Sequence, residues 1–212
     1  HLHIALGSRP SGADAFAYTH AAQLMLGKHD PGLFPTDVRK SRDAMPEDVV
    51  YVSFGTDGKH VISAMDAVLD GYQFDQLVEH LTLLDYARPF FDLVDAPAAF
   101  DGPPRSEGPL AAIERQPADC SSFGDLVESV AADIDEHGDD ALVVIDSLSD
   151  LYLARRFGLD ERSLLGFLVG LREAAVEWNG LVHVLYNRQA ANARADPVVA
   201  NLLHGNVYFY SN

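Results

Sequence analysis

A run of six residues constrains the fold of this chain most. Residues 141–146 have the sequence ALVVID, five apolar residues followed by an acid. A strand that is apolar at every position, rather than at every second one, is typical of a parallel sheet with both faces covered by helices. Other short β-rich runs alternate with helical patterns along the chain, which predicts an α/β fold.

The pattern predicts six strands and five helices in a single domain over residues 1–212. The predicted strands are 2–6, 49–54, 90–94, 141–146, 181–186 and 207–210. The predicted helices are 14–26, 74–87, 123–137, 161–178 and a short one that starts at Asp196-Pro197 and ends at Gly205. Residues 27–48 are expected to form a long surface excursion, and the Pro- and Gly-rich residues 96–122 to be mobile.

The chain is strongly acidic. It has 32 acidic and 15 basic residues, a formal net charge of −17, and its bases include only 3 lysines. Such a surface repels phosphate backbones, so nucleic acid is not an expected partner. Abundant Asp with very little Lys resembles the composition of proteins from extreme halophiles, and an acidic mesophilic protein is the alternative.

The sequence predicts a cytoplasmic protein. No apolar run approaches the ~20 residues that span a bilayer, and no basic segment of a secretory leader precedes the first strand. The single cysteine, Cys120, excludes an intrachain disulfide, and no nearby cation would activate its thiol, so we expect it to be structural. We therefore expect no membrane partner.

A glycine-rich turn joins the first predicted strand to the first predicted helix. The turn comprises Gly7, Ser8, Arg9, Pro10, Ser11, Gly12, Ala13 and Asp14. Its glycines match the G-x-x-x-x-G spacing of a phosphate-binding loop, whose next two residues are normally Lys and Ser/Thr. Ala13 supplies no cation there, and Asp14 adds a negative charge that is favourable at a helix N-terminus. The alternative is an ordinary Gly-rich turn.

A second candidate lies at the end of the central strand. Asp146 and Ser147 follow four apolar residues, as the acid of a Walker B strand does, roughly 130 residues after the turn. Because ligands of such sheets bind at the carboxyl ends of the strands, Asp146 is expected to lie at the same edge as Gly7–Asp14. Asn187 and Arg188 either face this edge or begin a solvated loop.

These features together resemble the RecA/KaiC-like ATPase domain. The resemblance rests on the turn 7–14, on 50–54 (VYVSF), on 144–148 (VIDSL) and on the closing helix and strand 171–187. It implies a three-layer α/β/α fold with a mainly parallel RecA-like sheet. It also implies the strand order last, first, fifth, fourth, second, third, and further C-terminal strands beyond residue 212.

Three positions depart from the family pattern. Members of the family usually carry two glutamates directly after the Tyr-Val-Ser-Phe strand, where this chain has Gly55 and Thr56. Ala13 and Asp14 replace the lysine and the magnesium-binding hydroxyl. The resemblance therefore implies a degenerate pseudo-ATPase with no catalytic residue and a vestigial nucleotide site at Gly7–Asp14, Asp146 and Ser147. Arg9 is a candidate replacement for the lost cation.

The function that we expect is a cytoplasmic signalling or scaffold module that does not hydrolyse ATP and that assembles with itself or with another protein. A nucleotide-binding sensor and an active ATPase with a non-standard loop are the alternatives. No cofactor is expected, and ATP with magnesium would bind weakly. The nine histidines show no metal-ligand spacing, and Ser147 and Ser149 lack the G-x-S-x-G motif of a hydrolase nucleophile.

Overall fold

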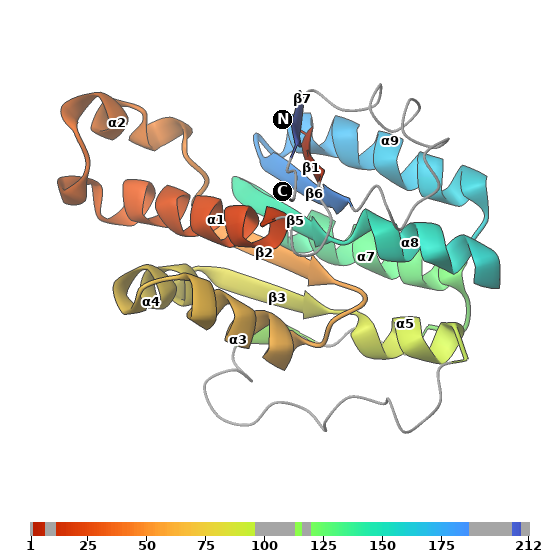
Figure 1. The fold of residues 1–212 in the computed structure, drawn as a ribbon. Helices are drawn as coiled ribbons and strands as arrows, with labels where there is room; N and C mark the ends of the chain where they lie inside the picture. The colour runs from red at the N-terminus through yellow and green to blue at the C-terminus, as the bar shows by residue number, and fades with distance from the viewer. Residues whose placement is uncertain (1, 7–11, 96–112, 116–119, 187–204, 209–212) are drawn as a thin grey trace.

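The computed structural model describes residues 2–6, 12–95, 113–115, 120–186 and 205–208 (Figure 1). The strands are β1 Leu2–Leu6, β2 Asp48–Ser53, β3 Leu81–Asp85, β4 Glu114–Arg115, β5 Ala141–Asp146, β6 Leu181–Tyr186 and β7 Gly205–Tyr208. The α-helices are α1 Ala13–His29, α2 Thr36–Lys40, α3 Gly58–Val68, α4 Gly71–Glu79, α5 Ala87–Leu93, α7 Phe123–His137, α8 Leu148–Ala154 and α9 Glu161–Glu177. Short 3-10 helices are η1 Pro31–Leu33, η2 Arg42–Ala44 and η4 Arg155–Phe157.

The strands form one parallel sheet in the order β4-β3-β2-β5-β6-β1-β7. The parallel α/β prediction is therefore confirmed. The order also agrees with the one that the family resemblance implies for the first, second, fourth, fifth and last strands. β5, the ALVVID run, lies at the centre of the sheet and is buried at all six positions.

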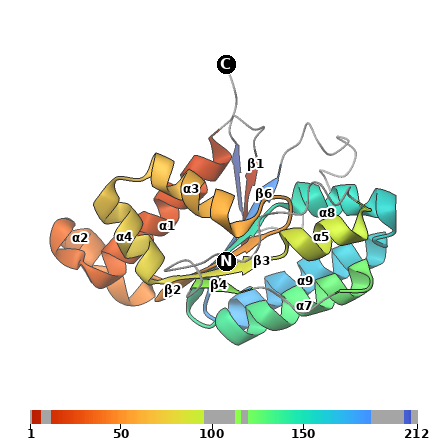
Figure 2. The same cartoon turned by 90° about the horizontal axis from the view of Figure 1, so that it is seen from below.

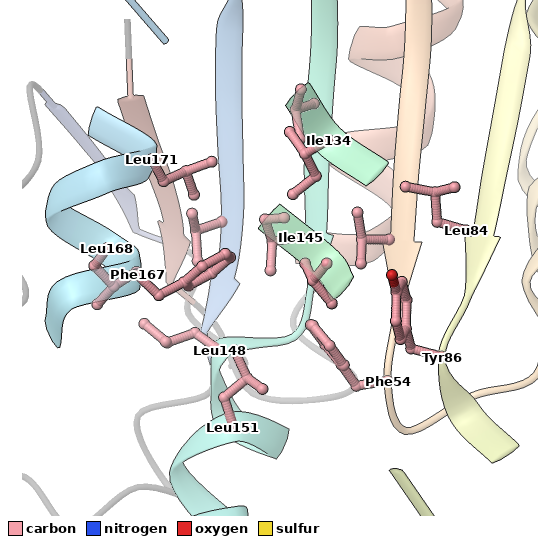
Figure 3. Packing of buried hydrophobic residues seen from close by; sticks show 14 of the residues in the cluster. Phe54, Leu84, Tyr86, Ile134, Ile145, Leu148, Leu151, Phe167, Leu168 and Leu171 are labelled. Atoms are coloured by element: carbon pink, nitrogen blue, oxygen red, sulfur yellow. The ribbon is translucent and has the colours of Figure 1, made fainter. Parts of the chain in front are cut away.

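Helices cover both faces of the sheet (Figures 1 and 2). Successive residues of β2 separate the two layers: Val49 and Tyr51 pack with α1, α3 and α4, while Val50 and Val52 pack with α7, α8 and α9. Figure 3 shows the second of these cores. Ile145 of β5 belongs to the same cluster as Phe167 of α9, and Phe54 lies near Tyr86. This is the three-layer α/β/α arrangement that the sequence predicts.

The predicted helix 74–87 is wrong in its second half. The structure ends α4 at Glu79 and continues as β3, which pairs with β2 from Val49↔Leu81 to Ser53↔Asp85. Leu77, Leu81 and Leu84 satisfy a helical spacing, so local periodicity alone does not separate the two elements. Pairing with β2 buries β3 on both faces, and this tertiary gain decides its conformation.

The predicted strand 90–94 is also wrong, because Phe90 and Phe91 lie in helix α5. Pro89 occupies the first turn of α5, where a backbone N–H has no partner within the helix, so proline is tolerated there. The aromatic side chains point into the core from a helix: Phe90 packs 6.4 Å from Phe54 and 6.1 Å from Phe123, ring centroid to ring centroid. The order implied by the resemblance places the strand 90–94 at one edge of the sheet. Among the strands that the structure describes, β4 forms that edge instead.

The other predicted helices agree with the structure where it describes them. α1 contains 14–26 and extends to His29, α7 spans 123–137, and α9 begins after the N-cap Asp160, whose side chain accepts a hydrogen bond from the backbone of Ser163. Residues 27–48 end α1 and then form the predicted surface excursion, which contains the short helices η1, α2 and η2 and is mostly exposed. The helix predicted from Asp196, the predicted strand residues 209–210 and most of residues 96–122 lie outside the described residues.

Candidate functional site

The candidate site lies at the carboxyl edge of the sheet, where β1, β2, β3 and β5 end. Five predicted site residues, Gly7, Ser8, Arg9, Pro10 and Ser11, lie outside the described residues. The structure places the other five as follows: Gly12, Ala13 and Asp14 at the start of α1, and Asp146 and Ser147 between β5 and α8. β6 alone separates β1 from β5 in the sheet. The two groups of residues therefore share one edge.

Gly12 begins α1 in the left-handed conformation, with φ 85°. This φ favours glycine, and a side chain added there would be strained even though no atom of the described residues lies within 4 Å of an added Cβ. Ala13 is buried, with 8% of its surface exposed, and joins the core between α1 and the sheet. Asp14 adds its carboxylate to the first turn, where the helix dipole favours a negative charge.

Asp146 is buried at the end of β5, with 3% of its surface exposed. The hydroxyl of Tyr51 on β2 donates a hydrogen bond of 2.8 Å to Asp146 Oδ2. Burial raises the pKa of the Tyr51 phenol well above its ordinary value, and the neighbouring Asp146 carboxylate adds to this, so Tyr51 remains a donor at neutral pH. Tyr18 of α1 packs 6.0 Å from Tyr51, which links the first helix to the acid at the end of β5.

The peptide bond between Asp146 and Ser147 is cis. Ser147 is the N-cap of α8: its hydroxyl oxygen accepts a hydrogen bond from the backbone N–H of Asp150, and the hydroxyl donates to Asp150 Oδ2 at 2.6 Å. This reciprocal pairing satisfies one of the free N–H groups of the helix start. It also fixes the direction of the Asp150 carboxylate.

Asp150 lies directly against Gly55, the residue that follows the Tyr-Val-Ser-Phe segment 51–54. A Cβ atom at position 55 would approach Asp150 Oδ1 to 2.7 Å and its Cγ to 2.9 Å. Such contacts are too short for real side chains, so any side chain at position 55 requires Asp150 to move. The glutamate that the resemblance expects at this position therefore does not fit beside Asp150 as it stands.

A further buried acid, Asp85, ends β3. Its two carboxylate oxygens accept hydrogen bonds from the backbone N–H groups of Gly58 at 2.8 Å and Ala87 at 2.9 Å. Desolvation raises the pKa of Asp85 above its ordinary value, against the opposing effect of these two hydrogen bonds. Asp85 thus fixes the starts of α3 and α5 beside the site, as a structural acid.

Sequence reasoning did not single out Tyr51, Asp85 or Asp150. Tyr51 carried a signal, because a tyrosine inside the apolar run VVYVSF needs a partner for its hydroxyl once it is buried. Asp85 is the last residue of β3, and Asp150 lies in the first turn of α8. The bounds of these two elements are not evident from local periodicity. No sequence signal identifies their partners.

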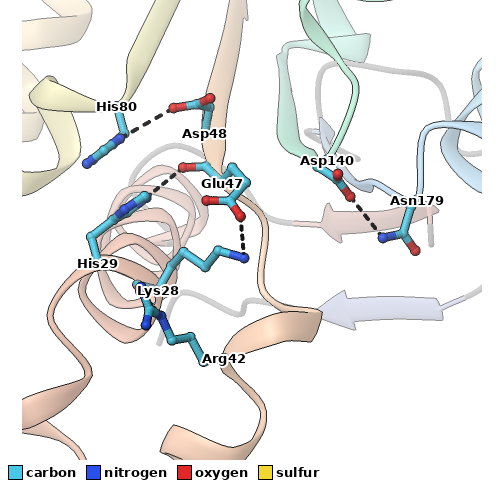
Figure 4. A network of polar contacts seen from close by, with 8 residues as sticks. All are labelled: Lys28, His29, Arg42, Glu47, Asp48, His80, Asp140 and Asn179. Atoms are coloured by element: carbon cyan, nitrogen blue, oxygen red, sulfur yellow. Dashed lines mark hydrogen bonds and ion pairs between the residues drawn. The ribbon is translucent and has the colours of Figure 1, made fainter.

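The three lysines do not replace the missing loop cation at the start of α1. Lys28 is at the other end of that helix, where its Nζ lies 2.6 Å from Glu47 Oε1 and its hydrogen bond lowers the pKa of the Glu47 carboxyl (Figure 4). Lys40 belongs to α2, beyond that same end (Figure 1). Lys59 begins α3 after β2, and β5 and β6 separate β2 from β1.

Figure 4 shows polar side chains of α1 and of the end of α4 gathered at the amino edge of the sheet. The rings of His29 and His80 stack with centroids 3.6 Å apart, His29 Nε2 donates to the backbone oxygen of Glu47, and His80 Nδ1 lies 3.4 Å from Asp48 Oδ1. These contacts join the last turns of both helices to the start of β2. They form an end of the molecule opposite to the candidate site.

Within the described part of the chain, no group of three or more His, Cys, Asp or Glu residues could hold a metal ion. In the same part, no helix is both long and apolar enough to cross a membrane. Cys120 is partly buried and packs against the core. Asn187 and Arg188 lie outside the described residues.

Comparison with known proteins identifies the fold. No family model matches the sequence, and no curated protein matches it significantly. The structure is similar to the crystal structure of a KaiC-like protein from the hyperthermophilic archaeon Pyrococcus horikoshii OT3, with a TM-score of 0.53 and 14% sequence identity. The match covers 100% of this chain and 74% of that chain. The chain therefore has a RecA/KaiC-like fold.

Proposed function

We propose that residues 1–212 form a single, degenerate RecA/KaiC-like domain that does not hydrolyse ATP and acts as a cytoplasmic signalling or scaffold module. The observation that carries this proposal is the packing at position 55. Gly55 lies against the Asp150 carboxylate, so the glutamate that the resemblance expects there is absent and would require this carboxylate to move. Thr56, the next position, carries no acid either.

Two other features support the loss of hydrolysis. Ala13 is buried where the resemblance places the phosphate-binding lysine, and Asp14 stands where it places the magnesium-binding hydroxyl. Asp146 already accepts the hydroxyl hydrogen of Tyr51. Phosphoryl transfer depends on positioning and on cations around the phosphates, so the absence of the lysine, the magnesium-binding hydroxyl and the water-activating glutamates removes most of that machinery.

We expect no ATP turnover above background. The measurement is steady-state phosphate release with ATP and magnesium, at low and at molar potassium chloride. The controls are the Asp146→Asn and Asp150→Asn variants, because these acids are the two carboxylates that β5 and α8 bring to this edge. Turnover by the unmodified protein that either substitution abolishes would contradict the proposal and favour an active ATPase.

A nucleotide-binding sensor is the second candidate, and the start of α1 favours it. Gly12 adopts the left-handed conformation before a 17-residue helix, and it has no side chain that could cap the first N–H groups. Helix N-termini of this kind bind phosphate through backbone N–H groups. Calorimetry with ATP and magnesium separates the two candidates, because the sensor binds without turnover and the scaffold does not bind.

The net charge of −17 supports a further part of the proposal, that the protein is adapted to high salt. Added salt shortens the Debye length from ~10 Å at 0.1 M to ~3 Å at 1 M, which screens repulsion among these charges. We expect the melting temperature to rise by about 5–10 °C between 0.1 M and 2 M potassium chloride, a stabilisation of roughly 2–3 kcal/mol for a chain of this size. Circular dichroism checks this, with sucrose at matched osmolality as the control for solvent exclusion. A melting temperature that stays flat would contradict halophilic adaptation.

A further inference from the structure

Three arginines lie close together at one corner of this acidic molecule, as Arg39, Lys40 and Arg42 do at the α2 end. Residues 116–154 contain ten acids and neither Lys nor Arg, and Arg155, Arg156 and Arg162 then follow within eight residues. They belong to η4 and the first turn of α9, at the opposite end of the molecule from α2 (Figures 1 and 2). We call Leu153, Arg155, Arg156, Phe157 and Arg162 the α8–α9 corner.

Two of these arginines form no ion pair within the described part of the chain, although the charge of Arg162 helps to lower the pKa of the Asp160 carboxyl. Arg155 is the exception: its guanidinium lies 2.8 Å from Glu161 Oε2 and 5.6 Å from the centre of the Tyr152 ring. Asp160 is occupied as the N-cap of α9. Arg156 and Arg162 are exposed, and no described carboxylate lies within ion-pair distance of either guanidinium.

Two large apolar side chains accompany them. Leu153 and Phe157, one turn apart, are 45% and 49% exposed. Their neighbours Leu151, Ala154 and Leu159 are at most 4% exposed and anchor the segment in the core, and the backbone N–H of Leu159 donates to the carbonyl of Ala154. The corner is therefore anchored in the fold, and its exposed apolar pair belongs to the same segment as the exposed Arg156, shortly before the exposed Arg162.

We propose that the α8–α9 corner is a docking surface for an acidic segment of another protein that carries large apolar side chains. Carboxylates of the segment bind Arg156 and Arg162, and its apolar side chains cover Leu153 and Phe157. Arginines beside an aromatic side chain are typical of residues that dominate binding at protein interfaces. Opposite charges also direct such a partner to this corner, because most of the surface repels it.

Charge favours a short acidic segment over a nucleic acid. α7 packs beside α9 (Figures 1 and 2) and carries five acids and no Lys or Arg, so a long polyanion that leaves the corner would meet like charge. A compact acidic segment is confined to the corner itself. This inference goes beyond the proposed function and does not rest on it, because ATP turnover and binding at the corner are measured separately.

The test uses a fluorescein-labelled peptide of about 16 residues, with Leu and Phe at i, i+3, i+4 and i+7 spacing and Glu elsewhere. We expect it to bind the unmodified protein in fluorescence anisotropy. Arg156→Glu/Arg162→Glu should weaken binding at least about tenfold at low salt and less at molar salt, where charges are screened. Leu153→Ser/Phe157→Ser should weaken it at least about tenfold at both salt concentrations.

The matched control is Arg39→Glu/Lys40→Glu, the same charge reversal on α2, which should change the affinity less than about twofold. Circular dichroism establishes that each variant folds, and all six substituted residues are exposed. The proposal is overturned if the peptide does not bind the unmodified protein, or if neither corner variant weakens it. It is also overturned if single-stranded DNA of equal charge binds the corner as tightly, or if light scattering shows that these substitutions abolish a self-assembled dimer instead.

Discussion

Replacement of Phe54 by alanine is expected to lower the free energy of unfolding by about 3–5 kcal/mol. Phe54 follows β2 directly and is fully buried in the core that α7, α8 and α9 cover. Its ring packs 6.0 Å from Tyr86 and 6.4 Å from Phe90, and its backbone N–H donates to the carbonyl of Asp146. Truncation leaves a cavity where the ends of β2 and β3 meet α5 (Figure 3). The cavity cannot close, because the sheet fixes the positions of β2 and β3.

Urea unfolding followed by circular dichroism measures this loss. A decrease of this size corresponds to roughly 6–20 °C in melting temperature for a chain of this length. Phe157→Ala is the matched control: the same change at a side chain that is 49% exposed should cost less than about 1 kcal/mol. Equal losses for the two variants would show that the core of the protein is not packed as the structure describes.

Most of the sheet could be predicted from the sequence, because its strands are distinguished by composition. β5 is apolar at its first five positions, and the carboxyl edge follows from its terminal Asp146. The errors fall where local periodicity fits two structures. Residues 81–85 satisfy a helical spacing after α4, and the capping box of Asp70 and Gln73 marks only where α4 begins, not that it ends at Glu79. Only pairing with β2 identifies the strand, and that pairing is not local.

The candidate site shows the same division. The positions of Gly12, Ala13 and Asp14 at the start of a helix could be predicted, since turn and helix patterns are local. The hydrogen bond between Tyr51 and Asp146 joins residues 95 positions apart. The contact of Asp150 with Gly55 is of the same kind, because it depends on how α8 leaves β5. Contacts between distant elements determine whether the site can work, and a single sequence does not give them.

The double substitution Ala13→Lys/Asp14→Thr is expected to raise the affinity for ATP and magnesium at least about tenfold, a gain of ~1.4 kcal/mol. The left-handed Gly12 and the 17-residue helix α1 already present backbone N–H groups at this edge. Their partial positive charge remains available to a phosphate. Asp14 is an unfavourable charge for such a ligand, and Ala13 supplies no cation, so the two substitutions reverse both effects at once.

Isothermal titration calorimetry with ATP and magnesium at molar salt measures this gain, and Asp66→Thr/Ala67→Lys is the control. That variant makes the same two changes of residue type at exposed positions of α3, so it alters the net charge equally without touching the start of α1. Hydrolysis should not return in the double variant, because neither Gly55 nor Thr56 carries an acid that could activate water. If the double variant binds no better than this control, Gly7–Asp14 is an ordinary Gly-rich turn, since only a loop that still cradles phosphate responds to a lysine and a hydroxyl at these two positions.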